Sequence, residues 1–178
     1  MAKLKILQYP DPLLKRKAKL VTDFKDPALQ EAIDDMLETF CETENCAGLA
    51  ATQLSLNDPF SVTVMAHPDN PEEIMCLINP EIIKKIGQKT LLEGCMSVFP
   101  QLFSFPIERA EEIVVKAFDR SGKEIHINAK NLLAKAIQHE IDHLNGTLYI
   151  DHLSKLKRDR LETKIHKILE QQKKKETQ

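Results

Sequence analysis

The stretch NLLAKAIQHEIDHL, from Asn131 to Leu144, constrains the fold more than any other part of the chain. Its apolar residues recur at helical spacing, and Gly146 follows at a position typical of a helix end. The pattern predicts an amphipathic helix over about residues 131–144. A helix places residues i and i+4 on one face, so His139 and His143 should present their imidazoles to one point. We expect this helix to lie buried at the centre of the domain.

The segment Q-H-E-I-D-H adds a carboxylate beside the first histidine. In an H-E-x-x-H helix the two histidines bind a metal ion, and the glutamate, here Glu140, acts on a water molecule as a general base. The small Ala136, three residues before His139, leaves room beside the first imidazole. The same short pattern also occurs on polar helix faces with core histidines. A catalytic metal site needs a third protein ligand as well.

Cys95, in L-L-E-G-C-M-S, is the candidate for this third ligand. A thiolate binds divalent transition metals strongly, and Gly94 lets the backbone approach a bound group closely. The alternative is a buried free thiol, the commonest fate of an isolated cysteine. Cys41, Cys46 and Cys76 fit that alternative better.

The stretch A-G-L-A-A-T-Q, residues 47–53, combines small residues with an amide. Gly48 and its alanine neighbours permit tight backbone packing, and Gln53 offers a neutral hydrogen-bond donor. Small residues followed by a glutamine also occur at ordinary helix starts, so this stretch alone leaves both interpretations open.

The remaining patterns predict one α+β domain over residues 1–178, with antiparallel strands around the central helix and helices at both ends. Asp26 and Pro27 are a typical start for the first helix. Prolines and phenylalanines in residues 99–108 indicate an irregular loop. Strands are expected at 61–66, 74–79, 113–118 and 124–128, a C-terminal helix at about 154–172, and a frayed tail at 173–178.

Composition narrows the class of protein. Apolar residues make up 42% of the 178 residues and the net charge is −2, so the whole chain does not resemble a nucleic-acid or membrane binder. The N-terminus lacks the apolar segment of a signal peptide, and the four cysteines show no disulfide spacing. We therefore expect a cytoplasmic protein with reduced thiols and no membrane association.

Taken together and in this order, three motifs resemble those of the peptide deformylase family. They are C-A-G-L-A-A-T-Q from Cys46, E-G-C-M-S from Glu93 and Q-H-E-I-D-H from Gln138. Y-P-D-P-L near the N-terminus, I-N-P-E from Ile78 and the charged C-terminal helix extend the resemblance over nearly the whole chain. It implies an α+β fold and a metal-dependent hydrolase of translation that removes the formyl group from the N-terminal formyl-methionine of nascent polypeptides.

The resemblance also implies roles for matched positions. Cys95, His139 and His143 would bind one divalent metal, usually ferrous iron, with zinc, nickel or cobalt able to occupy the same site. Glu140 would be the general acid/base, while Gln53 and the backbone N–H of Met96 would face the formyl oxygen. Glu93 would support the site, paired with Arg109. The substrate would contact Gly48, Ala47, Leu132 and Ala136.

Two features depart from the family pattern. Cys46 replaces the first glycine of the first motif, and Ala47 stands where a larger aliphatic residue is common, which predicts a looser pocket for the methionine side chain. The stem of Lys135 is expected to lie along this pocket. The segment from Val98 to Phe105 contains no arginine that could bind the peptide backbone.

The C-terminal segment is basic, with nine Lys/Arg against four Asp/Glu from Leu153 onward. Both the charge and the resemblance suggest docking on ribosomal RNA, although a solvated helix face would look the same. We expect a monomer. Two other functions remain open. One is a metallopeptidase, which would more usually have a histidine or carboxylate as its third ligand. The other is a catalytically weak or inactive protein that binds the ribosome and uses the metal only to stabilise its structure, and such a protein would need neither Glu140 nor Gln53.

Overall fold

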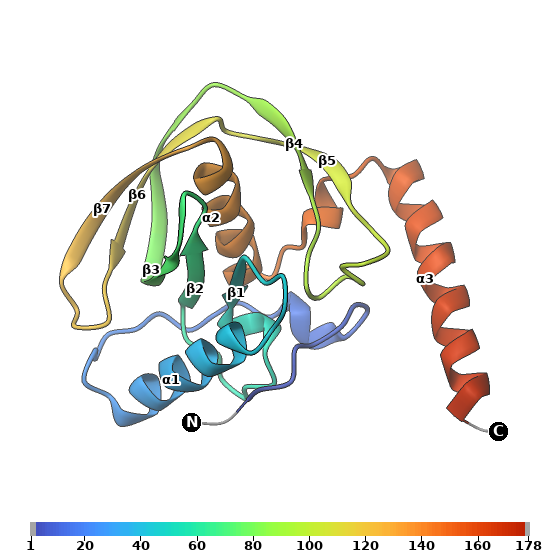
Figure 1. Cartoon of the computed structure of the whole chain (residues 1–178), viewed down its shortest axis with the longest axis horizontal. Coiled ribbons are helices and arrows are strands. Elements are labelled where there is room, and N and C mark those ends of the chain that lie inside the picture. The colour runs from blue at the N-terminus through green and yellow to red at the C-terminus, as the bar shows by residue number, and fades with distance from the viewer. Residues whose placement is uncertain (1–2, 177–178) are drawn as a thin grey trace.

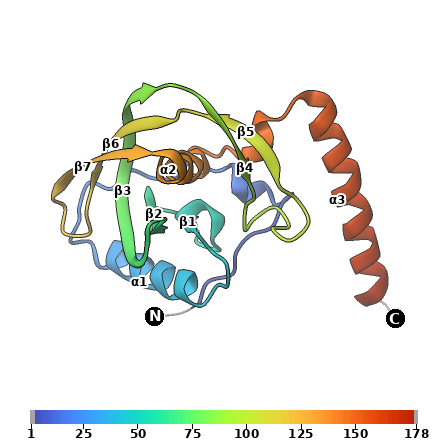
Figure 2. The same cartoon turned by 45° about the horizontal axis from the view of Figure 1, so that its top comes forward.

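The predicted central helix forms as α2, Asn131–Leu144, in the computed structural model, which describes residues 3–176. Figure 1 shows α2 in the middle of the molecule, and Figure 2 shows it nearly end-on with strands arching around it. Ala134 and Ile137 are completely buried on its inner face. After the helix, Gly146 adopts a φ of 74°, a left-handed conformation that ends the helix and favours glycine.

A five-stranded antiparallel sheet wraps around α2. Its strand order is β1-β2-β3-β6-β7, so the first and last strands form the two edges. β3 is much longer than the segment predicted at 74–79. Its register against β6 shifts between Ile78 and Glu81, where Pro80 interrupts the ladder, and again between Ile82 and Lys84. The strands are β1 (Gly48–Ala50), β2 (Val62–His67), β3 (Asn70–Ile86), β6 (Glu112–Phe118) and β7 (Glu124–Lys130).

A separate strand pair crosses the top of the molecule in Figure 1. It consists of β4 (Lys89–Glu93) and β5 (Phe105–Arg109), which pair antiparallel. The expectation of an irregular loop over residues 99–108 is therefore wrong from Phe105 onward. Pro106 is tolerated because each strand of a two-stranded pair has one free edge, where a missing N–H costs nothing. β4 leads directly into Cys95.

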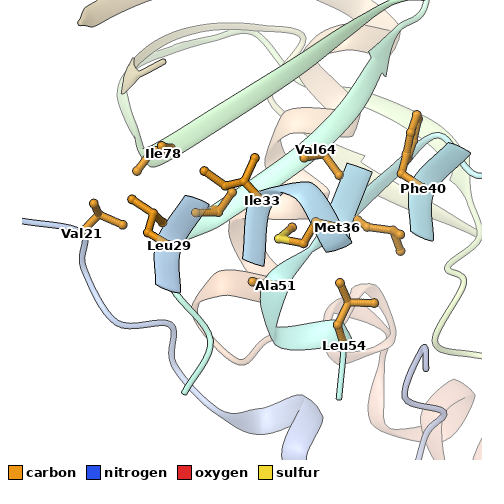
Figure 3. Close-up of a cluster of buried hydrophobic side chains, with 11 residues drawn as sticks. Val21, Leu29, Ile33, Met36, Phe40, Ala51, Leu54, Val64 and Ile78 are labelled. Atoms are coloured by element: carbon orange, nitrogen blue, oxygen red, sulfur yellow. The ribbon is translucent and has the colours of Figure 1, made fainter. Parts of the chain in front are cut away.

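The helix α1 (Pro27–Cys41) begins as predicted, because Asp26 Oδ1 accepts a hydrogen bond from Ala28 N at 2.9 Å. Figure 3 shows its apolar face directed toward the sheet, with Ile33 and Met36 in the middle of the cluster. This cluster packs α1 against β2 and the segment that follows β1. The α+β class is confirmed: one domain of antiparallel strands around a central helix.

The helix α3 (Lys155–Glu176) lies at the side of the molecule, beyond β4 and β5 in Figure 1. It packs through Leu161 and Ile165, both 2% exposed, on a cluster that also contains Cys95. The helix continues to Glu176, beyond the predicted end near 172, while residues 177–178 of the predicted frayed tail lie outside the described residues. The described part of the chain also contains three short 3-10 helices: η1 (Pro12–Lys15), η2 (Ala51–Gln53) and η3 (Tyr149–His152).

Among residues 3–176, no helix is long and apolar enough to cross a membrane.

Candidate metal centre and active site

The two histidines of α2 meet Cys95 from the end of β4 at one point. His139 Nε2 and His143 Nε2 are 3.2 Å apart, and Cys95 Sγ lies 3.2 Å from His143 Nε2. The three possible ligand atoms all lie within 4.8 Å of one another. The helical spacing therefore brings the two imidazoles together, as expected from the sequence, and the segment after β4 adds the thiol of Cys95.

This geometry fits a bound metal ion. Ligand atoms around a tetrahedral ion, bound at about 2.0–2.3 Å, are separated by about 3.3–3.7 Å, close to the distances between these side chains. Two imidazoles and a thiolate are donors that zinc and ferrous iron accept. Next to them, the buried Oε2 atom of Glu140 has no hydrogen-bond partner among the described residues. Cys95, His139 and His143 can thus hold a metal ion, beside a carboxylate oxygen that is ready to accept a hydrogen bond.

Glu93 orients the first histidine. Its Oε2 lies 3.0 Å from His139 Nδ1, which leaves Nε2 directed toward Cys95 and His143. Arg109 donates to both oxygens of Glu93, from Nε at 2.8 Å and from Nη2 at 3.1 Å. The pairing of Glu93 with Arg109 expected from the resemblance is therefore present, and both side chains are buried.

Burial and charge set the protonation of these groups. Burial opposes ionisation of Glu93, but hydrogen bonds from His139 and Arg109 outweigh it and lower the pKa of this carboxyl to about 2. Burial holds the pKa of His143 well below its usual value, which keeps its ring neutral, the form that binds metals. Burial also opposes protonation of His139, but hydrogen bonds with Cys95 and Glu93 raise its pKa to about 10, so metal binding there displaces a proton.

Glu140 lies against the backbone of β1. A Cβ atom placed on Gly48 would be 2.7 Å from Glu140 Oε1, so only glycine leaves room for this carboxylate. Burial raises the pKa of Glu140 to about 7, with the nearby charge of His139 opposing and that of Glu93 adding to the effect. A carboxyl group with this pKa can both accept and return a proton near neutral pH.

Two hydrogen-bond donors lie close to Cys95. Gln53 Nε2 is 3.7 Å from Cys95 Sγ and 3.1 Å from Ser97 Oγ, and Gln53 Oε1 accepts from Ala50 N at 2.8 Å, which fixes the amide orientation. The backbone N–H of Met96 donates to no atom of residues 3–176 that the structure records. It is therefore free to bind a ligand.

A cavity of about 490 Å³ opens beside these groups. It is lined by most of the residues predicted for the site, but Arg109 and His143 do not line it. Leu132 does not reach it: this side chain is 52% exposed and lines a separate surface cavity with His67 and Asn128. The predicted residues that line the larger cavity are Ala47, Gly48, Gln53, Glu93, Cys95, Met96, Ala136, His139 and Glu140.

Several supporting residues were not assigned a role from the sequence. Asp142 accepts from Arg109 Nη1 at 2.5 Å and lies 2.7 Å from His152 Nε2, which extends the chain of contacts from His139 to the surface. Ser97 and Asp142 belong to the quoted motifs, which was the one available signal for them. Gln8 gave no such signal, yet its Nε2 donates to Met96 O at 2.7 Å and holds the loop after Cys95.

Comparisons with known proteins agree on one family. A family model described as polypeptide deformylase matches residues 3–159. Peptide deformylase 1 of Coxiella burnetii is 48% identical over 167 residues, covering 94% of this chain and 97% of that protein. A peptide deformylase of Chromobacterium violaceum is 46% identical, with 94% and 96% covered.

Solved structures give the same result. A crystal structure of a peptide deformylase from Legionella pneumophila has a TM-score of 0.84 and 40% identity, and covers 96% of this chain and 98% of that one. A peptide deformylase from Ehrlichia chaffeensis in complex with actinonin has a TM-score of 0.83 and 35% identity, with 94% and 98% covered.

Proposed function

The chain belongs to the peptide deformylase family, and from this premise we propose how its own residues carry out the reaction. The enzyme hydrolyses the amide between a formyl group and the N-terminal methionine of new polypeptides. Water adds its oxygen to the formyl carbon, the C–N bond breaks, and formate and a free amino terminus are released. The observation that carries the assignment of residues is the convergence of Cys95, His139 and His143 beside the unpartnered Oε2 of Glu140.

Cys95, His139 and His143 hold a divalent metal ion in this proposal. Ferrous iron is the expected ion in the cell, and zinc, nickel or cobalt can replace it. An ion bound there would act as a Lewis acid, which would polarise the formyl oxygen and lower the pKa of a water molecule. Glu93 and Arg109 keep His139 in the tautomer that presents Nε2 to the ion. The donor set supports this, because a soft thiolate and two imidazoles suit these metals better than calcium or magnesium.

Glu140 acts as the general base and then as the general acid. Its Oε2 takes a proton from the attacking water and delivers it to the amine nitrogen as the C–N bond breaks. Burial of the carboxylate and its raised pKa support both steps. The backbone N–H of Met96 and the amide of Gln53 donate to the formyl oxygen while negative charge develops on it. Gly48 provides backbone contacts to the substrate beside Glu140.

Formate release tests this assignment directly. Anaerobically iron-loaded protein should release formate from a formyl-Met peptide and none from its acetylated counterpart. Glu140→Ala should lose activity by at least about 100-fold while it still binds one metal ion. A variant that keeps activity would refute the role of Glu140. Absence of formate from protein shown to contain one metal ion would favour the alternative of a ribosome-binding protein without catalysis.

The same assay with protein loaded with zinc, nickel or cobalt compares the metals. Air should inactivate the iron form fastest, because ferrous iron and the thiolate of Cys95 are both open to oxidation. Equal loss of activity for the iron and zinc forms in air would contradict this expectation.

We also propose that α3 docks on the ribosome, which places the enzyme in the cytoplasm beside its substrate. Support comes from its charge and exposure: Lys164 and Lys167 are exposed, whereas Leu161 and Ile165 pack against the domain. Cosedimentation with ribosomes should weaken with salt and with charge reversal of these two lysines. Charge reversal of Lys84 and Lys85 on β3 is the control. Equal weakening by both pairs would refute a specific role of α3.

A further inference from the structure

Lys135 forms part of the cavity wall although it belongs to none of the catalytic groups. It lies one helical turn before His139 on α2, is half-buried and lines the cavity together with Ala136. Its Nζ donates a hydrogen bond to Leu92 O of β4 at 3.1 Å. The side chain therefore spans the gap between the helix that carries both histidines and the strand that leads to Cys95.

The ammonium of Lys135 has spare hydrogen-bonding capacity. A lysine ammonium carries three N–H donors, and within residues 3–176 Leu92 O is the only acceptor found for them. No carboxylate of the described residues lies within 4.0 Å of it, in contrast to Lys116, whose Nζ is 3.2 Å from Glu124 Oε2. Two donors and an unpaired positive charge are thus available to a bound molecule.

The surroundings of the ammonium determine what it can bind. Ala47, Ala136 and Met96 contribute apolar surface to a cavity that polar residues such as Gln101 also line, and Ala136 stands next to Lys135 on α2. The four-carbon stem of Lys135 adds apolar surface before its charged tip. A side chain that enters along this wall meets apolar surface first and hydrogen-bond donors at its end. The wall therefore fits an extended side chain that carries an acceptor atom near its end.

We infer that Lys135 determines which first side chain the enzyme accepts, and that it favours one with a polar acceptor near its end, such as methionine sulfoxide, over a purely apolar one. The inference rests on the proposed function, because it places the first residue of the formyl peptide beside Ala136 when the formyl group is at the metal site. The sulfoxide oxygen accepts a hydrogen bond from the Lys135 ammonium. Norleucine, which has the same length without an acceptor, makes no such bond.

The test compares two N-formyl tripeptides that differ in their first residue, methionine sulfoxide or norleucine. The readout is the ratio of their kcat/KM values in the metal-loaded protein. Lys135→Met should lower the sulfoxide-to-norleucine ratio about tenfold, the effect of one hydrogen bond to a charged group. Lys135→Arg, which keeps charge and donors, should hold the ratio within about threefold. Lys116→Met, a lysine of β6 outside the cavity, is the matched control for loss of a lysine charge.

The ratio separates recognition from a structural role. If Lys135 merely ties α2 to β4, Lys135→Met will lower kcat/KM for both peptides equally and leave the ratio unchanged, which overturns the inference. A fall in the ratio for Lys116→Met as large as for Lys135→Met would overturn it too. If the unsubstituted, metal-loaded protein releases formate from neither peptide nor from formyl-Met, the proposed function itself fails and the inference falls with it.

Discussion

Gly48 and Glu140 touch so closely that position 48 has no room for a side chain. A Cβ atom there would lie 2.7 Å from Glu140 Oε1 and 3.2 Å from its Cγ. The glycine belongs to the edge strand β1, and the glutamate to the central helix α2. The glycine of the first motif therefore leaves the space that the glutamate of the third motif occupies.

Gly48→Ala should displace the Glu140 carboxylate and lower kcat about 100-fold, because a shift of about 1 Å in a catalytic group has an effect of this size. Metal content should stay at one ion per chain. The double variant Gly48→Ala with Glu140→Ala provides the control. If the clash is the cause, the alanine at position 48 will cost little further activity once Glu140 is absent, whereas a second independent loss would show that Gly48 acts elsewhere.

Glu93 should make stability depend on pH in the acid range. Its pKa is lowered to about 2, so its contribution is fully present above the ordinary carboxyl pKa of about 4.5 and is lost as the pH falls toward 2. We expect Glu93→Gln to reduce the free energy of unfolding by on the order of 3 kcal/mol at pH 7, with a much smaller difference near pH 2.5.

Urea denaturation across this pH range measures the difference between the two proteins. The control is Glu108→Gln, because Glu108 is exposed on β5 beside Arg109 and should matter by less than about 0.5 kcal/mol. A difference for Glu93→Gln that stays constant from pH 7 to 2.5 would contradict the ionised pairing of Glu93 with Arg109 and His139.

Gly146 secures the end of α2 against the N-terminal segment. It has a φ of 74°, and a Cβ atom there would collide with the carbonyl of Lys15. Gly87 has a similar φ of 66°, but its Cβ would meet only the side chain of Glu111, with Oε2 at 3.3 Å and Cβ at 3.4 Å. Gly87→Ala should therefore cost about 1–2 kcal/mol from backbone strain alone. Gly146→Ala should cost about 2 kcal/mol more because of the collision.

The midpoints of urea unfolding compare these two glycine variants under identical conditions. Equal losses for both would mean that backbone conformation alone decides the cost, and that the Lys15 carbonyl moves aside.

The free thiols should differ in reactivity. Burial raises the pKa of Cys46 to about 12, with the charge of Glu140 adding to it, and burial raises that of Cys76 to about 11. Because the thiolate is the reactive form, iodoacetamide at pH 7.5 should modify the exposed Cys41 first. Alkylation of Cys46 should rise about tenfold per pH unit between pH 8 and 10. Mass spectrometry of the native protein measures how fast each cysteine is alkylated, and Cys41→Ser is the control that identifies the Cys41 signal. Alkylation of Cys46 as fast as that of Cys41 would contradict this prediction.

Local patterns were sufficient for the parts of the site that lie on one element. The 3.6-residue period predicted α2, and the i,i+4 rule then placed His139 and His143 together. Asp26 and Pro27 predicted the start of α1 for the same reason: capping depends on neighbours in the chain. The motifs around Cys95 and Gln53 carried the resemblance, which supplied their roles before any contact was known.

Long-range pairing was not predictable in the same way. β4 and β5 pair across residues 94–104, and Pro106 within a phenylalanine-rich segment favoured a loop over a strand. The resemblance implied that Leu132 contacts the substrate, yet this side chain is 52% exposed and lines a separate surface cavity. Gln8 holds the loop after Cys95 from 88 residues away, and nothing in its local sequence indicates this contact.

The amino-acid sequence by itself therefore determined the central helix, the α+β class, the ligand types and the kind of chemistry, because these depend on short-range periodicity and on the side chains present. Only the tertiary structure decided that Gly48 makes room for Glu140, and that Lys135 spans the gap between α2 and Leu92 of β4. It also decided that Glu93, Arg109 and Asp142 connect His139 to His152. Such contacts join segments far apart in the chain, and their geometry exists only once the sheet has wrapped around α2 and packing has set the distances.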